Sequence, residues 1–586
     1  MNLEQFYADR AATYAQQVDV LHRRGRGFAV TEVVTFIAFF AILVGTTQTV
    51  SGVWRVTEGV LALVMLAVYI VVRRMDVRND ERIRCLEDLH AAYDRERQAQ
   101  QDDYSAFDDG ARYVDVHHAY SYDLDLFGAD GLYQRLCRTV TVGGSDALAR
   151  HLTSLQPLSA TPEEIDRLSA DEPFRMAFIA RGIRGPIDTE AIRQSLSAVG
   201  EVPVPALFSS PLLRLLVWAD VVAFLAAIVL AAVGMVGTML PVWWGVVHFF
   251  LAYTLCNAIL QRIGGVLNRL RGQMRRLVGV VSLMTAEPIA AFEGLNALLD
   301  ALDRRGNILG LLFTNAFFLS DVLAVRRFAV WRRQRAAEVE QWIDRVVRRD
   351  VEVTVATFRY NHPSAVWPEH VVAPDTLTFE GRGLWHPFLG AEAVRNDFKI
   401  DDRHFYIVTG ANMAGKSTFL RAVGVNYVLA MAGLPVFAER LAVSRFQLFS
   451  SMRTSDDLSR GISYFNAELL RLKHLIDYCD TPLAATDGQP MPTLIILDEI
   501  LKGTNSADKL NGSRMFLEAI SQKHVSGIIA THDLALSAMA DQHPMRFHNY
   551  CFEIALSEPI AYSYKITPGV ARNQNATYLL QRILRR

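Results

Sequence analysis

The stretch Gly410-Ala411-Asn412-Met413-Ala414-Gly415-Lys416-Ser417-Thr418 decides the fold of the C-terminal part of the chain. It matches the pattern G-x-x-x-x-G-K-[ST] and lies between a strand-like run, Phe405–Val408, and a helix-like run, Phe419–Gly424. Glycines in such a loop let backbone N–H groups surround phosphate oxygens, and the N-terminus of the next helix adds partial positive charge. We therefore predict that Gly410–Thr418 binds the phosphates of a nucleoside triphosphate.

Two side chains of this loop carry specific roles in the prediction. Lys416 is expected to reach the β and γ phosphates, and the hydroxyl of Ser417 is expected to join the coordination shell of Mg²⁺. ATP and Mg²⁺ are therefore the expected cofactors.

A second buried strand ends in two acids. Leu494–Leu497 is a continuous aliphatic run, as in a parallel sheet covered on both faces, and Asp498 and Glu499 follow it. Ligands bind at the carboxyl ends of parallel strands. This is the form of a Walker B motif, in which Asp498 would hold the Mg²⁺ and Glu499 would orient or deprotonate the attacking water.

A third aliphatic run, Ile528–Ala530, is followed by Thr531 and His532. A histidine at this strand end is predicted to contact the γ-phosphate and sense hydrolysis. Ser463 opens a helix-like run and suits an N-cap position. Strands and helices alternate from about Tyr360 onward, which predicts an α/β domain with a mostly parallel sheet.

Composition points to a membrane protein with several domains. The 586 residues carry a net charge of -2, which does not favour an extended nucleic-acid surface. The hydrophobic fraction is 51% and the mean hydropathy is positive, which indicates membrane segments. The five cysteines form no C-x-x-C pair, so neither a disulfide framework nor a zinc site is predicted.

Four apolar stretches come near the roughly 20 residues needed to span a bilayer. They form two predicted hairpins, Ala29–Thr47 with Val56–Val72, and Leu215–Gly237 with Pro241–Leu260. Glu32 and Asp220 interrupt them near predicted helix ends, where polar residues are tolerated. Buried core helices are the alternative interpretation.

Arginines give the predicted orientation. They flank the outer ends of both hairpins, whereas the short connecting loops hold one basic residue, Arg55. The positive-inside rule then places both termini and the intervening chain in the cytoplasm, in a multi-pass inner-membrane protein. The predicted parts are an N-terminal helix (1–27), a transmembrane hairpin (28–75), an all-α core (76–208), a second hairpin (209–262), a helical lever (263–350) and the ATPase domain (351–586).

The chain resembles the MutS family. The resemblance rests on His386-Pro387, TGANMAGKSTFLR (Thr409–Arg421), TSDDLSRGISYFNAEL (Thr454–Leu469), LDEILKGTNSADK (Leu497–Lys509) and ATHD (Ala530–Asp533). It implies an ATP hydrolase of the P-loop, MutS/ABC class, with Lys416, Asp498, Glu499 and His532 as catalytic residues. It also implies a homodimer in which Ser463 of one subunit caps the γ-phosphate bound by the other.

The chain departs from the family pattern in several places. Ala411 and Ala414 replace the usual Pro and Gly, which keeps the Gly-Lys-Ser core for ATP binding but leaves the hydrolysis rate open. Leu501-Lys502 replaces the usual Gly-Arg after the two acids, a change that bears on inter-subunit signalling. The first hairpin stands where the mismatch-reading domain would be, and the second hairpin stands in place of the DNA clamp. The resemblance therefore implies possible DNA binding, but we expect no mismatch specificity because the wedge and clamp are missing.

Two other functions remain open from the sequence. One is an ABC-type transport or extrusion ATPase, against which stands the lack of an L-S-G-G-Q signature before the Walker B strand. The other is a nucleotide-regulated structural membrane protein. The intact Lys416, Asp498, Glu499 and His532 favour an active ATPase working as a nucleotide-driven switch.

Overall fold

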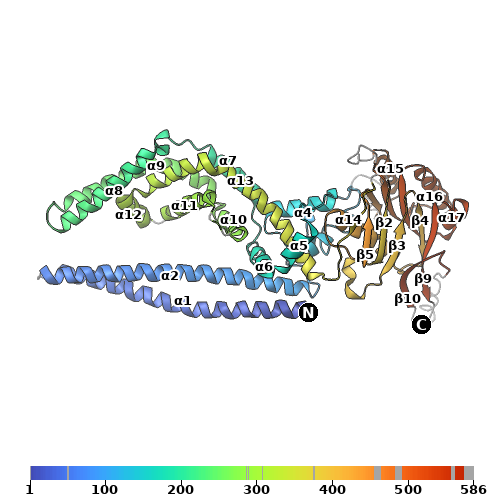
Figure 1. Ribbon diagram of the computed structural model, residues 1–586, viewed down its shortest axis with the longest axis horizontal. Helices are drawn as coiled ribbons and strands as arrows, with labels where there is room; N and C mark the ends of the chain where they lie inside the picture. Colours follow the sequence, from blue (N-terminus) through green and yellow to red (C-terminus); the bar gives the residue numbers. More distant parts are fainter. Residues whose placement is uncertain are drawn as a thin grey trace. The chain divides into compact units, whose positions relative to one another are not determined.

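The computed structural model describes residues 2–48, 52–285, 287, 289–306, 308–373, 376–453, 464–481, 491–555 and 561–572 (Figure 1). The chain forms two compact units, each built from several segments. The helical unit comprises Met1–Asp103, Arg138–Ala147 and Asp171–Val353, and the ATPase unit comprises Tyr104–Cys137, Leu148–Ala170 and Thr354–Arg586.

A six-stranded sheet with the order β10-β9-β4-β8-β7-β6 forms the centre of the ATPase unit. Its strands are β4 (Phe405–Gly410), β6 (Gln447–Ser451), β7 (Thr493–Asp498), β8 (Val525–Thr531), β9 (Phe547–Ala555) and β10 (Ala561–Pro568). Neighbours from β9 to β6 pair in parallel, and β10 alone is antiparallel. The prediction of an α/β domain with a mostly parallel sheet is confirmed.

Buried aliphatic residues explain why β4, β7 and β8 lie centrally. All six residues of β4 and all seven of β8 are buried, as expected for strands covered on both faces. Ile407, Ile495 and Ile529 belong to one core cluster with Leu475 and Leu517 of the neighbouring helices. These helices are α14 (Lys416–Met431), α15 (Tyr464–Asp480), α16 (Ser506–Ile520) and α17 (Ala538–Gln542).

A second, four-stranded sheet has the order β1-β5-β2-β3. Its strands are β1 (Glu369–His370), β2 (Phe379–Leu384), β3 (Asn396–Ile400) and β5 (Arg440–Val443). The ATPase unit also includes α3 (Leu132–Leu136), most of α4 (Val142–Ser154) and α5 (Pro162–Ala170). At α5, Glu164 N–H donates to Thr161 Oγ1 and Thr161 N–H donates to the Glu164 carboxylate, and this reciprocal pair forms a capping box.

The helical unit begins with two long antiparallel helices, α1 (Leu3–Gln48) and α2 (Gly52–Ala99), drawn in blue in Figure 1. Each continues a predicted span into a charged segment without a break. Asn79 of α2 donates to the Leu21 carbonyl, and His90 lies 3.0 Å from the Ala11 carbonyl, so the polar halves also pair.

The second predicted hairpin is α8 (Pro211–Ala232) and α9 (Met239–Leu267). The remaining helices of this unit are α6 (Glu172–Ala180), α7 (Thr189–Gly200), α10 (Arg271–Met284), α11 (Ala290–Arg305), α12 (Ile308–Phe318) and α13 (Ser320–Asn361), the last of which continues into the ATPase unit. Buried Asp350 of α13 accepts hydrogen bonds from Val140 N–H, Thr141 N–H and Thr141 Oγ1, which ties α13 to the start of α4.

Three helices of the described chain are long and apolar enough to cross a membrane, and they contain Leu3–Gly45, Pro211–Ala231 and Met239–Leu267. The prediction of four spans is corrected to three for these residues. The fourth predicted span, Val56–Val72, lies within α2, which is not one of these three helices.

Candidate active site

The loop between β4 and α14 adopts a backbone conformation that requires glycine at position 415. Gly415 has φ = +106°, a left-handed conformation that side chains rarely adopt, and a Cβ there would lie 3.1 Å from the Tyr564 ring. Met413 also has positive φ, at +67°, and its side chain is exposed. The strand, loop and helix predicted around Gly410–Thr418 are therefore present, with α14 starting at Lys416.

Lys416 is buried beneath this loop. Its ammonium donates to the carbonyl oxygens of Gly410 (2.8 Å) and Ala411 (3.0 Å). Burial lowers the pKa of Lys416 to about 8, against the opposing influence of the Asp498 and Glu499 carboxylates. The Lys416 amino group therefore loses its positive charge at mildly alkaline pH.

Ser417 and Asp498 come together from different elements. Ser417 lies in the first turn of α14, Asp498 ends β7, and the Ser417 hydroxyl donates to Asp498 Oδ2 over 2.5 Å. A hydroxyl and a carboxylate at this separation are hard oxygen donors of the kind that Mg²⁺ prefers. The predicted metal ligands are thus within reach of one ion.

Glu499 is held by the backbone and by one lysine. Its φ is +63°, a strained value for a residue with a side chain, and its N–H donates to the Ala530 carbonyl. Lys509 of α16 donates to Glu499 Oε1 over 3.1 Å. Burial alone would raise the pKa of Glu499, but the Lys509 hydrogen bond and charge outweigh it, so the net pKa is lowered. The carboxylate is ionised at neutral pH.

His532 follows the end of β8, and both of its ring nitrogens lie 3.4 Å from Lys416 Nζ. Partial burial, and then the Lys416 charge, lower the pKa of His532. The imidazole is therefore neutral at pH 7 and can accept or donate one hydrogen bond at the loop.

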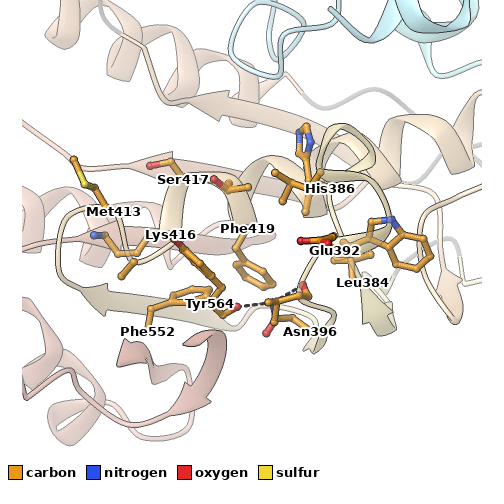
Figure 2. A pocket seen from close by; sticks show the side chains of 18 of the residues that line it. Leu384, His386, Glu392, Asn396, Met413, Lys416, Ser417, Phe419, Phe552 and Tyr564 are labelled. Carbon is orange, nitrogen blue, oxygen red and sulfur yellow. Dashed lines mark hydrogen bonds between the residues drawn. The ribbon is translucent and has the colours of Figure 1, made fainter. Parts of the chain in front are cut away.

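A cavity of about 600 Å³ adjoins the loop, within the size range of small-molecule sites (Figure 2). Figure 2 shows Lys416 and Ser417 at one end and Leu384, His386 and Glu392 at the other. Tyr564 lies between them; its carbonyl accepts a hydrogen bond from Asn396 Nδ2, which holds β10 beside β3. The cavity combines aromatic walls with a polar loop, which suits a ligand with a flat ring and an anionic tail.

The predicted site residues fall into two groups. The loop residues Gly410, Ala411, Asn412, Met413, Ala414, Gly415, Lys416, Ser417 and Thr418 lie with Asp498, Glu499 and His532 at the carboxyl edge of β4, β7 and β8. Ser463 lies outside the described residues, one position before α15 begins at Tyr464.

Sequence reasoning missed Lys509 and the cavity residues Trp385, Phe552 and Tyr564 as site residues. Lys509 is the last residue of the motif Leu497–Lys509 and lies 10 residues after Glu499. A turn and the start of α16 separate the two residues in sequence, so only the fold brings their side chains together. Trp385 stands directly before the His386-Pro387 pair, which was the available signal.

Comparison with known proteins fits this geometry. The family profile of MutS domain V matches residues 406–580. These residues therefore form a domain of the MutS family. MutS domain V is the ATPase domain of that family, so the edge described above lies in a MutS-type ATPase domain.

Curated relatives match part of the chain. DNA mismatch repair protein MutS 2 of Halobacterium salinarum is 31% identical over 247 residues, covering 41% of this chain and 27% of the relative. DNA mismatch repair protein MutS of Granulibacter bethesdensis is 31% identical over 291 residues, covering 45% and 30%. That of Brevibacillus brevis is 32% identical over 207 residues, covering 34% and 22%. The chain thus spans under a third of the length of these MutS proteins.

Proposed function

We propose that this chain is a membrane-anchored MutS-like ATPase that works as a homodimeric, nucleotide-driven switch. The observation that carries the proposal is the meeting of Lys416, Ser417, Asp498, Glu499 and His532 at one edge of the parallel sheet. This is the set that phosphoryl transfer to water needs: a phosphate loop, metal ligands and a carboxylate for the nucleophile.

ATP fits the site in two parts. The triphosphate would lie along the loop at the N-terminus of α14, where backbone N–H groups and Lys416 favour anions. The base would enter the cavity between His386 and Tyr564, which offers aromatic surface. Mg²⁺ held by Ser417 and Asp498 would supply charge neutralisation at the phosphates.

Glu499 is the proposed base or water-orienting group. Its lowered pKa keeps it ionised, and Lys509 fixes one oxygen while the second oxygen of the carboxylate remains available for a water. His532 is placed beside Lys416, so a γ-phosphate bound by Lys416 would also meet His532. That arrangement supports the role of His532 as a sensor of hydrolysis.

The dimer is proposed from the family resemblance. Ser463 would cap the γ-phosphate of the other subunit, so that ATP favours the closed dimer and hydrolysis releases it. One local feature supports a link from this region to the Walker B strand: Lys502 N–H donates to Glu468 of α15, and Lys502 Nζ donates to the Met452 carbonyl. A shift of α15 would therefore reach the turn after Glu499.

Anchoring is proposed to run through the apolar helices, with the ATPase unit in the cytoplasm. The exposed apolar side chains of α8 and α9, among them Leu215, Val222 and Trp243, are what lipid contact requires. DNA without mismatch specificity remains a proposed partner, since the relatives are named DNA mismatch repair proteins.

The test uses the full chain purified in detergent. Mg²⁺-dependent ATP hydrolysis is expected, and Lys416→Ala should abolish it, whereas Lys473→Ala, which changes an exposed lysine on α15, should not. Equal hydrolysis in the two variants would refute the assignment of the site. Adding linear, mismatched and branched DNA then tests the partner. A response to none of them removes DNA from the proposal, and a clear preference for mismatched DNA contradicts the expected lack of specificity.

A further inference from the structure

Helix α12 has the composition of a membrane segment although it stands in the predicted cytoplasmic lever. Between Arg305 and Arg326 the only charged residue is Asp321. On α12 the side chains of Ile308, Leu312, Phe313 and Phe318 are between 44% and 79% exposed. Four large apolar side chains on one short helix form a surface that a water-exposed lever does not need.

α12 lies against the α8–α9 hairpin within the same unit (Figure 1). The ring of Phe317 packs 5.7 Å from that of Phe224 of α8, and a Cβ at Gly245 of α9 would lie 3.7 Å from the Ala316 carbonyl. A wholly apolar cavity of about 580 Å³ lies between the three helices. The exposed side chains of α12 thus continue the apolar surface of the two predicted spans.

Length and direction show how far α12 would penetrate. Its 11 residues measure about 16 Å, roughly half of the ~30 Å hydrocarbon core. Arg305, which precedes α12, donates to Asn257 in the C-terminal half of α9. Ala316, near the end of α12, contacts His248, which lies closer to the tip of the hairpin. The helix α12 therefore runs along α9 towards the hairpin tip and stops partway.

At the end of α12, protein side chains and backbone groups satisfy polar groups that would otherwise be exposed to lipid. A half-span helix ends with carbonyl groups that water cannot satisfy inside a bilayer, so protein must satisfy them. The buried His248 donates from Nδ1 to the Ala316 carbonyl over 3.0 Å, and its Nε2 lies 2.6 Å from Asp220 Oδ2. The Leu319 N–H donates to the Asn315 carbonyl at a left-handed turn, φ = +48°.

The returning chain is held in the same way. At the start of α13, the Asp321 N–H donates to Asn315 Oδ1 over 2.9 Å, and Ser320 Oγ donates to Thr314 Oγ1. The Asp321 carboxylate is paired with Arg305, and both side chains are largely buried. The Asp321 N–H, the Ser320 hydroxyl and the Asp321 carboxylate are thus satisfied by protein, as membrane-embedded irregular backbone requires.

We propose that α12 is a re-entrant membrane segment whose exposed face contacts lipid acyl chains, so that the lever helix α13 begins inside the bilayer. The inference rests on the proposed anchoring of the α8–α9 hairpin. It also gives Asp220 and His248 a role: they close the end of α12 within the hairpin.

Spin labels on the full chain in phospholipid vesicles test this. Single cysteines replace Leu312 or Phe313 on α12, Val247 on α9 and Glu340 on α13, in a background with Cys85→Ser. All four target positions are exposed, so the labels should not disturb packing. The ratio of collisions with oxygen to collisions with a water-soluble nickel complex should be high at 247, 312 and 313 and low at 340.

The outcomes separate the two proposals. A water-like ratio at 312 and 313 with a lipid-like ratio at 247 overturns the re-entrant segment alone. A water-like ratio at 247 overturns the anchoring as well. Labels at 312 and 313 that are shielded from both reagents show a covering protein surface, which also contradicts lipid contact.

A second pair of variants tests the closing of the helix end. With the label at 313, His248→Leu removes the donor to Ala316 and should raise nickel collisions, whereas His248→Gln keeps a donor and should leave the ratio near that of the parent. Equal ratios in both variants would show that His248 does not hold the end of α12.

Discussion

The carboxyl edge of β4, β7 and β8 and the junction of α9, α12 and α13 both gather ionisable side chains, but by different means. At the sheet edge Asp498 ends β7 and Ser417 opens the helix that follows β4, so the order of the parallel strands brings the two side chains to 2.5 Å. At the helix junction Arg305 pairs with Asp321 and His248 lies beside Asp220, and these pairs form only because α12 docks on the hairpin.

The difference teaches where short motifs are informative. Parallel strands align their ends, so a motif at each strand end predicts a common site. A helix junction in an apolar setting has no such rule, and its polar groups must instead be paired because burial is costly. The four predictions below test this contrast.

The largest effect is expected at the sheet edge. Glu499→Gln removes the proposed base while keeping its shape, so ATP hydrolysis should fall by about 10²–10⁴-fold while ATP binding persists. The variant should accumulate as an ATP-bound dimer in size-exclusion chromatography. Glu518→Gln, an exposed acid on α16, is the matched control. Hydrolysis at the parent rate would exclude Glu499 from catalysis.

The next effect concerns the helix junction. Arg305→Met leaves the buried Asp321 without its charged partner, which should cost about 3–5 kcal/mol of stability. Combining Arg305→Met with Asp321→Leu removes both charges and should recover most of the loss. Thermal unfolding in detergent measures both variants. A double variant no more stable than the single one would show that the pair does more than neutralise itself.

A smaller effect is expected from pH. Because burial lowers the pKa of Lys416 to about 8, its charge is present below that value and is lost as pH rises through it. ATP affinity should therefore weaken above about pH 8, by at most about tenfold per pH unit, since one proton is involved. Equilibrium binding between pH 7 and 9 measures this, and an affinity constant across that range would contradict it.

The smallest effect belongs to a purely local motif. Thr161→Ala removes the cap of α5 and should lower stability by about 1 kcal/mol. Thr481→Ala, which removes only a hydroxyl bonded to the preceding turn of its own helix, is the control. Calorimetric unfolding of the two variants compares them; equal midpoints would show that the capping box contributes nothing measurable.

The sequence predicted the ATPase unit well because its information is local. The strands ending at Gly410, Asp498 and Thr531 lie where aliphatic runs predicted them, and the Thr161 cap follows from four consecutive residues. The Lys509–Glu499 pair was not predicted, because it depends on the turn between β7 and α16.

The helical unit was predicted less completely. The length of their apolar runs predicted α8 and α9 as spans. The 11 residues of α12 are too few for a span, so the sequence analysis placed them in the helical lever. From the sequence, Asp220 was interpreted as a polar residue that is tolerated near the end of a span. Its proximity to His248 arises only when α8 and α9 pack together. These contacts depend on how helices far apart in the sequence pack together, and the hydrophobic periodicity of the sequence does not predict that packing.

The unbroken course of α13 has a mechanical consequence. Its 42 residues form one helix of about 63 Å from Ser320 to Asn361, without an interior proline or glycine to bend it. A tilt of about 10° at one end of such a rod displaces the other end by about 11 Å, given that length. In the proposed nucleotide-driven switch, a tilt of α13 of this size would correspond to a movement of about a third of a bilayer's ~30 Å hydrocarbon thickness.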